Sequence, residues 1–484
     1  MKRELFIDGR WVAPLEGGYR NVIDPATNEI TGATAIATMP DLEKAVQAAH
    51  KAFPVWAGMM PDSRAVILHR AASLIDERVD HIAALLTREQ GKPLPDSRKE
   101  ILFGAEVLRY YAEEGRRMGG TLRPSIRPDI RCIVTGAPVG VVAAIVPWNY
   151  PVDLYAWKIA PALAAGCTMV VKPPPETPLA IAAVLECLVD AGLPPGVLND
   201  IPGDGPTIGA ALAAHPRISL ISATASVPAG QAIMRAAAGN LKRVALELGG
   251  QCPFIVLDDA NIEEAAAAAA RRSFSNMGQI CIAVNRIFVS HKVHDRFMEA
   301  LVSITSGIAP RPGMESGAVY GPAMNDSVRV RTQKHVDDAV YLGARLLCGG
   351  HNLTGSEYGN GFFYSPAVLD DVPVDALAMT QESFGPVAAV RSFETDAEAL
   401  RLANMLPFGL AAYVYGQDLD RAWALADQIE AGGIGINVND VSELQAPFGG
   451  WKMSGFGREL GVEGLETYRE SRHVRMKVRP RTTF

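Results

Sequence analysis

The sequence predicts an α/β fold with two doubly wound parallel-sheet domains and a small β arm. The chain has 484 residues, more than one ordinary domain accommodates. Short segments rich in Val, Ile and Ala alternate with helical segments in two series, one before and one after Gly249-Gly250. Continuous apolar strands separated by helices are typical of parallel sheets covered on both faces. Between the N-terminal helices and the first series, a polar, arginine-rich stretch indicates an exposed extended arm that contacts another subunit.

The N-terminal region is predicted to begin with a hairpin. Asp8-Gly9 favours a tight turn between strands at 5–7 and 10–12. Three helical patterns follow: one capped by Asp41, a long one from Asp62 to Thr87, and one over 97–117.

The two series place polar residues at strand ends. The first has strands at 140–146, 167–171, 198–201, 218–222 and 243–246, with helices at 152–165, 178–191, 206–214 and 228–238. The second has strands at 254–257, 286–290, 344–348, 364–368 and 387–393, with helices at 261–277, 293–304 and 396–405. Ligands of parallel sheets bind beyond the carboxyl ends of the strands. Pro147, Lys172 and Ser226 follow predicted strand ends, which indicates a dinucleotide site there.

The composition narrows the function classes. Hydrophobic residues make up 48% and charged residues 20%, as in soluble globular proteins, and the net charge of −7 gives no field that attracts nucleic acid or anionic membranes. The N-terminus lacks the apolar segment of a signal peptide, and no stretch has the length of a membrane span. The six cysteines form no CxxC pair, and the nine histidines show no metal spacing. We therefore expect no metal, reduced thiols and a cytoplasmic location.

Three residues with complementary chemistry carry the functional prediction. Cys281, in Gly-Gln-Ile-Cys, supplies the best nucleophile available near neutral pH. Glu247 ends an apolar strand, where burial raises the pKa of a carboxyl group toward that of a useful general base. Asn149 follows Pro147-Trp148 and offers an amide donor for an oxyanion. Together they suit acyl chemistry.

Each residue also has a simpler interpretation. A cysteine is more often a small buried apolar residue, and a strand-end glutamate or a post-proline asparagine can have a purely structural role. Lys172 could be a solvated loop lysine, and Glu382 a loop carboxylate. The turn at 225–230 is no GxGxxG motif, although it offers a helix N-terminus to a pyrophosphate.

Four motifs together decide between these interpretations. Pro-Trp-Asn-Tyr-Pro at 147–151, Glu-Leu-Gly-Gly at 247–250, Gly-Gln-Ile-Cys at 278–281 and Glu-Ser-Phe-Gly-Pro at 382–386 occur in this order. In the order and spacing of these motifs, the chain resembles the NAD(P)-dependent aldehyde dehydrogenase superfamily. The resemblance extends over nearly the whole chain. Each motif alone is weak, whereas the four together are highly specific.

The resemblance implies a mechanism and a cofactor site. Cys281 attacks the aldehyde, Asn149 and the Cys281 N–H hold the oxyanion, hydride passes to the nicotinamide, and Glu247 activates the water that releases the carboxylic acid. The cofactor, NAD with NADP left open, would contact the following residues: Ile145, Val146, Pro147, Trp148, Lys172, Gly205, Ser226, Leu248, Glu382 and Phe384.

The resemblance also implies the domains and the assembly. The dinucleotide-binding domain comprises 1–120 and 139–247, the catalytic domain 248–450, and 451–470 returns to the first domain. An oligomerisation arm at 121–138 and a tail at 471–484 would build a homodimer or homotetramer.

Departures from the family pattern bear on cofactor and substrate. Pro175 stands where many members have the glutamate that holds the adenosine ribose, so NADP stays open beside NAD. Ala223 and Ala225 replace the Phe and Gly of Phe-Thr-Gly-Ser, which affects cofactor affinity or pose. Members that act on succinate semialdehyde tend to have arginines where this chain has Trp157 and Ser275. We therefore predict an uncharged aliphatic or aromatic aldehyde, bound in a tunnel of Tyr150, Leu154, Trp157, Met277, Ile280, Ile282 and Phe448.

Two alternatives stay open from the sequence. In a CoA-acylating enzyme, a CoA thiol rather than water would take the acyl group, and Glu247 as a water-activating base speaks against this. In a catalytically silent binding protein, Cys281, Glu247 and Asn149 would have no reason to occur together.

Overall fold

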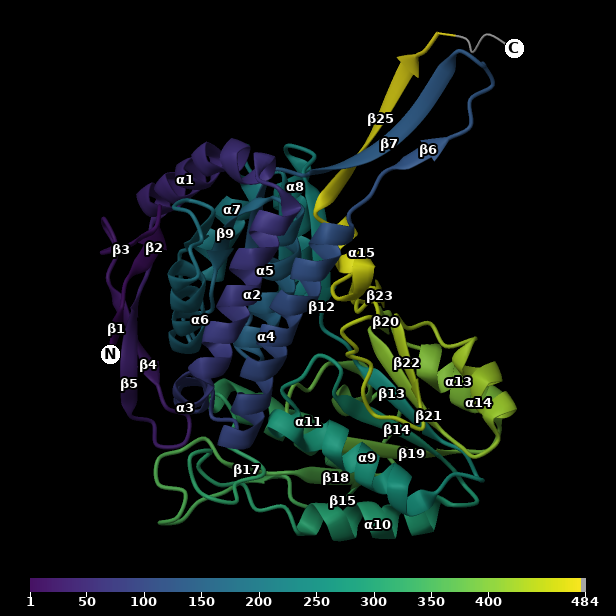
Figure 1. The fold of residues 1–484 in the computed structure, drawn as a ribbon. Helices are drawn as coiled ribbons and strands as arrows, with labels where there is room; N and C mark the ends of the chain where they lie inside the picture. Colours follow the sequence, from purple (N-terminus) through teal and green to yellow (C-terminus); the bar gives the residue numbers. More distant parts are fainter. Residues whose placement is uncertain (480–484) are drawn as a thin grey trace.

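The computed structural model describes residues 1–479 as two α/β lobes and a thin β arm that extends away from both (Figure 1). The first lobe contains an eight-stranded sheet, and the second lobe a seven-stranded sheet. Residues 480–484 of the predicted tail lie outside the described part of the chain. No helix within 1–479 combines the length and the apolar character needed to cross a bilayer.

The sheet of the first lobe has the strand order β24-β12-β11-β8-β9-β10-β2-β3. Strands β8 to β12 are parallel, whereas β2 and β24 are antiparallel to their neighbours. Their bounds are β2 Leu5–Ile7, β3 Arg10–Val12, β8 Val141–Ile145, β9 Thr168–Lys172, β10 Leu198–Asp200, β11 Leu220–Ala225, β12 Arg243–Leu248 and β24 Gly455–Phe456. The predicted strands are confirmed with shifted ends, because β9 includes Lys172, which was expected just beyond it, and β12 continues past Glu247 to Leu248. Because β9 and β11 flank β8 on opposite sides, the strand order reverses beside β8, where sheets of this kind bind ligands.

Helices cover both faces of this sheet. Helices α1 (Met39–Gly58), α7 (Ala210–Ala214) and α8 (Val227–Ala238) share one core with Val141 and Ala143, whereas α5 (Pro151–Ala165) and α6 (Leu179–Asp190) share another with Val142 and Ala144. Successive residues of β8 thus face opposite layers, as a strand requires. Helices α2 (Pro61–Glu77), α3 (Val79–Gln90) and α4 (Leu94–Arg117) form an outer layer (Figure 1).

Two predictions about these helices were wrong. The single helix expected from Asp62 to Thr87 is divided at Arg78, whose backbone (φ −106°, ψ 9°) leaves the helical conformation, so α2 and α3 pack separately on α4 and α6. The first helix is capped by Thr38 rather than Asp41. The Thr38 N–H donates to Asp41 Oδ2 at 2.9 Å, which places Asp41 in the first turn as the second member of a capping box.

The sheet of the second lobe has the order β15-β18-β19-β14-β13-β21-β22, and only β15 at its edge is antiparallel. The strands are β13 Cys252–Val256, β14 Val284–Ser290, β15 Arg345–Cys348, β18 Ala367–Asp370, β19 Val387–Phe393, β21 Ala411–Tyr415 and β22 Gly433–Ile436. The helices are α9 Ile262–Phe274, α10 His294–Ser306, α11 Asp326–Tyr341, α12 Leu377–Thr380, α13 Asp396–Asn404 and α14 Leu419–Ala426. The sequence did not reveal α11, β21, α14 or β22, and α9 ends earlier than expected.

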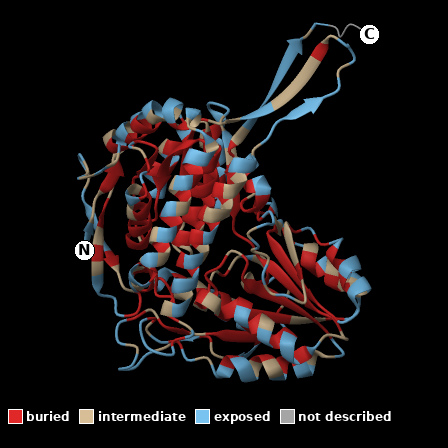
Figure 2. Cartoon of the chain, in the orientation of Figure 1, coloured by how far each residue is buried: buried red, intermediate tan, exposed pale blue. Residues whose placement is uncertain are grey.

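The arm is a three-stranded antiparallel sheet of β6 (Thr121–Arg123), β7 (Ile130–Pro138) and β25 (Arg469–Lys477). Figure 2 shows that the arm is mostly exposed, in contrast to the buried interiors of the lobes. The remaining strands and α-helix are β1 Lys2–Arg3, β4 Tyr19–Ile23, β5 Ile30–Ala35, β16 His351–Asn352, β17 Tyr364–Ser365, β20 Phe408–Gly409, β23 Trp451–Lys452 and α15 Gly461–Glu466. All six cysteines are free thiols.

Candidate active site

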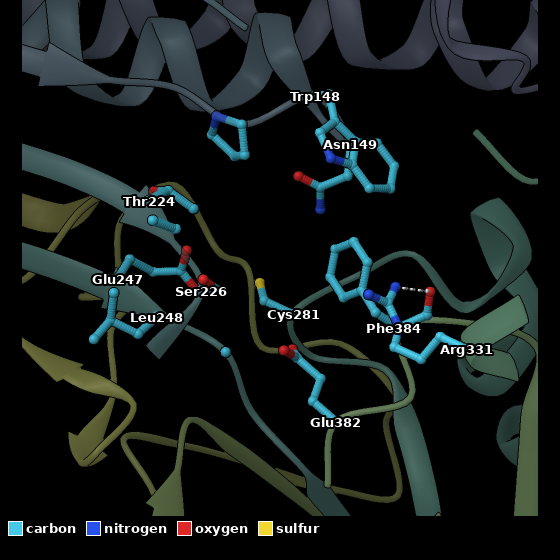
Figure 3. A pocket seen from close by; sticks show the side chains of 13 residues that line it. Trp148, Asn149, Thr224, Ser226, Glu247, Leu248, Cys281, Arg331, Glu382 and Phe384 are labelled. Atoms are coloured by element: carbon cyan, nitrogen blue, oxygen red, sulfur yellow. Dashed lines mark hydrogen bonds between the residues drawn. The ribbon is translucent and has the colours of Figure 1, made fainter. Parts of the chain in front are cut away.

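Two cavities meet between the lobes. The first, of about 200 Å³, lies at the carboxyl ends of β8, β11 and β12 (Figure 3). Its lining is Pro147, Trp148, Asn149, Thr224, Ala225, Ser226, Glu247, Leu248, Gly249, Cys281, Arg331, Glu382 and Phe384. The second, of about 280 Å³, is lined by Phe103, Asn149, Tyr150, Asp153, Leu154, Trp157, Arg272, Ile280, Cys281, Ile282, Asp440, Ser442 and Phe448. Asn149 and Cys281 line both, so an amide and a thiol stand where the two cavities join.

Most predicted site residues line one of these cavities, and five do not. Ile145, Val146, Lys172 and Gly205 are absent from the lining of the first cavity, and Met277 from that of the second. The sequence missed Arg331 in the first cavity and Phe103, Asp153, Arg272, Asp440 and Ser442 in the second. These six belong to no recognisable motif, since they come from distant helices and loops.

A strained turn positions Cys281. After α9, the backbone of Asn276, Met277 and Gly278 adopts left-handed conformations with φ values of 49°, 56° and 70°. A Cβ atom at Gly278 would lie 2.2 Å from the Gly385 carbonyl oxygen, so only glycine fits there. The Gln279 side chain closes the turn, because its amide donates to Asn276 O at 2.8 Å and its carbonyl accepts from Met324 N at 2.8 Å. Strain of this kind is typical of functional sites.

The backbone around Asn149 is held by buried polar groups. Its carbonyl oxygen accepts from Lys92 Nζ at 2.9 Å and from Asn276 Nδ2 at 3.1 Å, and its own Nδ2 donates to Gln279 O at 3.1 Å. Lys92 in turn forms a buried ion pair with Glu100. The second amide hydrogen of Asn149 stays available to the space beside Cys281, because one Nδ2 carries two donors.

Glu247 is a buried carboxyl group without a hydrogen-bond partner. Neither side-chain oxygen is paired within the described residues, and Figure 3 shows the group pointing toward the Cys281 sulfur. Burial, together with the nearby charge of Glu459, raises the pKa of Glu247 to about 8. Burial and the Glu247 charge also raise the pKa of the Cys281 thiol well above its usual value. A base of this pKa, next to a protonated thiol, can take the proton when the thiol attacks.

A buried ion pair lies behind Glu247. Lys158 Nζ pairs with Glu459 and donates to Thr224 Oγ1 at 2.7 Å, while Glu459 Oε2 has no partner in the described chain. A cavity of about 10 Å³ is lined by both Glu247 and Glu459. That space matches a single water molecule, which would connect the two carboxyl groups.

One wall of the first cavity is built from the second lobe. Glu382 accepts a hydrogen bond from Gly250 N at 3.2 Å, and burial raises the pKa of its carboxyl group to about 7. A Cβ atom at Gly249 would lie 2.4 Å from Glu382 Oε2. The Phe384 ring contacts Trp148 of the first lobe edge-on, with centroids 5.5 Å apart, and Arg331 Nε donates to Ser383 O at 2.8 Å. The cavity is therefore closed by a contact between the lobes.

The residues present fit a dinucleotide. Ser226 precedes the first turn of α8, whose unpaired N–H groups favour a phosphate. Lys172 is buried at the end of β9, near Gly209 and Ile145, where its Nζ donates to Gly203 O at 3.0 Å and burial lowers its pKa to about 8. The Glu247 carboxyl group has no hydrogen-bond partner in the described chain, and that of Glu382 accepts one hydrogen bond. Carboxyl oxygens of both residues can therefore accept hydrogen bonds from a ligand in the cavity.

A thiol, an amide donor and a buried base that meet beside a dinucleotide-type cavity define a nucleotide-dependent oxidoreductase with a covalent step. The aldehyde dehydrogenase family model matches residues 11–474. The chain belongs to this family. It is an oxidoreductase that oxidises an aldehyde with NAD⁺ or NADP⁺ as acceptor, as the sequence predicted.

Named relatives extend over nearly the whole chain. Succinate-semialdehyde dehydrogenase [NADP(+)] of Escherichia coli is 38% identical and aligns over 98% of this chain and 97% of its own length. Glutarate-semialdehyde dehydrogenase of Pseudomonas putida is 38% identical, over 99% and 98%. The crystal structure of betaine aldehyde dehydrogenase from Staphylococcus aureus in complex with NAD⁺ superimposes with a TM-score of 0.96 at 35% identity, covering 99% and 95%. The predicted fold class is thereby confirmed.

Proposed function

We propose that Cys281 is the nucleophile, Asn149 the oxyanion donor and Glu247 the general base of this oxidation. The single observation that supports this assignment best is the junction of the two cavities at Cys281 and Asn149, with the unpartnered carboxyl group of Glu247 pointing at the sulfur (Figure 3). A substrate in the second cavity and a nicotinamide in the first could both reach that sulfur.

The residues then act in sequence. Glu247 accepts the Cys281 proton as the thiolate sulfur attacks the carbonyl carbon, and the resulting thiohemiacetal oxyanion is held by Asn149 Nδ2 and the Cys281 N–H. A nicotinamide held in the first cavity would supply the acceptor for the hydride that leaves the thiohemiacetal carbon, and Cys281 would then carry the acyl group as a thioester. Glu247 then releases the Cys281 proton to solvent and, deprotonated again, takes a proton from a water molecule as the water oxygen attacks the thioacyl carbon. The C–S bond breaks, the carboxylic acid leaves and Cys281 regains a proton.

The cofactor contacts are divided between the lobes. Trp148, Ser226, Leu248, Glu382 and Phe384 would contact the dinucleotide directly, because they line the first cavity. Four predicted contact residues lie outside that lining. They would support the lining residues or contact the adenosine half of the cofactor: Ile145, Val146, Lys172 and Gly205. Because Pro175 supplies no carboxylate to repel a 2′-phosphate, both NAD and NADP are proposed acceptors.

The proposed substrate is an uncharged aldehyde. Named relatives act on succinate or glutarate semialdehyde, which carry a carboxylate. In this chain Trp157 lines the second cavity between Phe103 and Phe448, with ring centroids 6.4 and 5.1 Å away, and so presents an aromatic wall. The one arginine in the described lining, Arg272, donates to Asp440 Oδ2 at 2.7 Å and is already neutralised.

The assembly, domain division and location complete the proposal. We propose that the arm of β6, β7 and β25 builds a homodimer or homotetramer, because a thin exposed sheet needs a second surface. The lobes correspond to the predicted dinucleotide-binding domain (1–120, 139–247 and 451–470) and catalytic domain (248–450). Six free thiols favour a reducing compartment, proposed as the cytoplasm.

Initial rates of NADH and NADPH formation with a series of purified aldehydes test the proposal, with identification of the carboxylic acid. The Cys281→Ala variant should lose dehydrogenase activity and still bind nucleotide. Reaction that requires added CoA, or full activity of Cys281→Ala, would contradict it.

A further inference from the structure

The second cavity contains polar groups that nothing in the described chain satisfies. Asp153 and Trp157, four and eight residues after Asn149 near the start and middle of α5, both line it. Asp153 Oδ1 and Trp157 Nε1 are buried and have no hydrogen-bond partner within residues 1–479. Leaving a buried donor or acceptor unpaired costs about 1–3 kcal/mol. A pair of such groups in the wall of one cavity therefore indicates that a ligand supplies their partners.

Two charged residues of the same cavity, Arg272 and Asp440, are already paired with each other. Arg272 donates through Nε to Asn439 O and through Nη2 to Asp440 Oδ2, and Asp440 Oδ1 accepts from Ser442 N at 2.9 Å. The charges of Asp440 and Arg272 thus neutralise each other. Burial, reinforced by the charge of Glu100, raises the pKa of Asp153 well above its usual value. These effects favour the protonated form of Asp153, in which the carboxyl group can both donate and accept a hydrogen bond.

This arrangement disfavours both kinds of charged substrate. A substrate carboxylate in the cavity would lie close to the carboxyl groups of Asp153 and Asp440. The Arg272 guanidinium, which could bind it, already donates hydrogen bonds to Asn439 and Asp440. An ammonium would meet the Arg272 guanidinium, and Asp153 in its neutral form gives no compensating charge. A hydroxyl group suits the site better, because it can accept from the Trp157 N–H and exchange a hydrogen bond with Asp153 without bringing a net charge into a buried space.

We propose that the second cavity selects a small, neutral aldehyde that carries a hydroxyl group, held by Asp153 and the indole N–H of Trp157. This inference rests on the proposed function, since it concerns the substrate of the same thiol. It goes beyond the uncharged aldehyde of the previous section by naming a polar group and its two partners. The cavity of about 280 Å³ lies near the lower limit of small-molecule sites, which is consistent with a short substrate.

Trp157 is well placed to distinguish such substrates. Its ring is fixed edge-on between Phe103 and Phe448, so the direction of its N–H is determined by packing rather than by the substrate. A site that offers a preformed donor discriminates strongly against an analogue without the acceptor, whereas an apolar pocket distinguishes similar groups only weakly.

The test uses four aldehydes that differ mainly at the distal group: 3-hydroxypropanal, butanal, 3-aminopropanal and succinate semialdehyde. Butanal replaces the hydroxyl of 3-hydroxypropanal by a methyl group of similar size. We expect kcat/KM for 3-hydroxypropanal to exceed that for each of the other three by about tenfold or more. A higher kcat/KM for butanal, for the ammonium or for the carboxylate substrate would overturn the proposal.

Two variants assign the preference to the named side chains. Trp157→Phe removes the N–H and keeps a smaller aromatic side chain, and Asp153→Leu removes the hydrogen-bonding group at similar size. Each should lower the ratio of kcat/KM for 3-hydroxypropanal to that for butanal by about five- to tenfold, and a general loss of activity cancels in this ratio. An unchanged ratio in both variants would overturn the inference.

The two proposals fail in different ways. Oxidation of butanal with no preference for 3-hydroxypropanal would contradict the hydroxyl site and leave the thiol mechanism intact. No oxidation of any aldehyde by the folded wild-type protein would overturn the proposed function and the hydroxyl site with it. Asp153→Asn, which restores donor and acceptor, should recover most of the ratio lost in Asp153→Leu. Failure to recover it would contradict a hydrogen-bonding role for Asp153.

Discussion

The Lys158 ammonium pairs with the Glu459 carboxylate inside the first lobe, and the charges of both residues act on the pKa of Glu247 in opposite directions. Lys158 lowers that pKa, whereas Glu459 raises it and shares a water-sized cavity with Glu247. Burial raises the pKa of Glu247 most, and the ion pair adjusts the pH at which the proposed base becomes active.

Replacing Lys158 by methionine should shift the activity to higher pH. Without the positive charge, the pKa of Glu247 rises, so the rising limb of the kcat profile should move up by about one pH unit. The measurement is kcat from pH 6 to 10. The opposite change, Glu459→Gln, removes the charge that raises the pKa and should move the limb to lower pH. Shifts in the same direction in both variants would contradict this role of the pair.

The wild-type enzyme should show a pH profile governed by a group with a pKa of about 8. Glu247 acts as a base only when deprotonated, and its pKa is raised to about 8 mainly by burial. The rate of thioacyl hydrolysis should therefore increase about tenfold per pH unit below 8 and level off above it. Single-turnover release of the carboxylic acid measures this step. A rate that is constant between pH 6 and 8 would show that a different group activates the water.

Replacing Glu247 by glutamine should separate the two halves of the reaction. The amide keeps the shape of the side chain and cannot accept a proton, so hydrolysis of the thioacyl enzyme should slow by about 10²–10⁴-fold. Hydride transfer needs only a thiolate, which can be supplied by raising the pH. We expect a burst of NADH equal to the enzyme concentration, followed by a slow steady state, and mass spectrometry should detect the acyl group on Cys281. Equal loss of both phases would argue against a role in hydrolysis.

Much of this arrangement could be predicted from the sequence, because the parallel strands are apolar on both faces and end at recognisable motifs. Glu247, Cys281 and Asn149 each belong to a short motif, and the structure brings them to one junction. The long helix predicted over 62–87 was wrong because the break at Arg78 follows from packing on α4 and α6, which local periodicity does not record.

The site features that could not be predicted from the sequence depend on contacts between residues far apart in the chain. Asp153 lies in the helix predicted over 152–165, and its unpaired oxygen becomes evident only in the structure of the cavity. Arg272 and Asp440 are 168 residues apart, and no local pattern announces that they pair. The predicted contact of Gly205 came from the family resemblance, and that of Lys172 from the resemblance and its place at a strand end; neither residue reaches the lining of the first cavity.

Replacing Asn149 by alanine should reduce catalysis more than binding. Its amide is held beside Cys281 by the bond to Gln279 O and by the bonds that Lys92 and Asn276 make to its carbonyl. Loss of one oxyanion donor costs about 10²–10³-fold in kcat. Single-turnover NADH formation should fall by that factor, with little change in nucleotide affinity measured by fluorescence. A variant with normal kcat and a raised KM would show that Asn149 only binds the aldehyde.

The arm should control the assembly through one apolar row. Leu122, Ile133 and Val474 are register partners across β6, β7 and β25, so their side chains share one face of the arm, where Leu122 is 67% and Val474 42% exposed. The double variant Leu122→Asp/Val474→Asp puts two charges into this row and should reduce the mass measured by sedimentation to that of a smaller oligomer or monomer. His473→Asp is the matched control, because successive residues of a strand face opposite sides, and it should leave the mass unchanged. If the double variant sediments like the wild type, or the control dissociates as well, this face of the arm does not form the proposed contact.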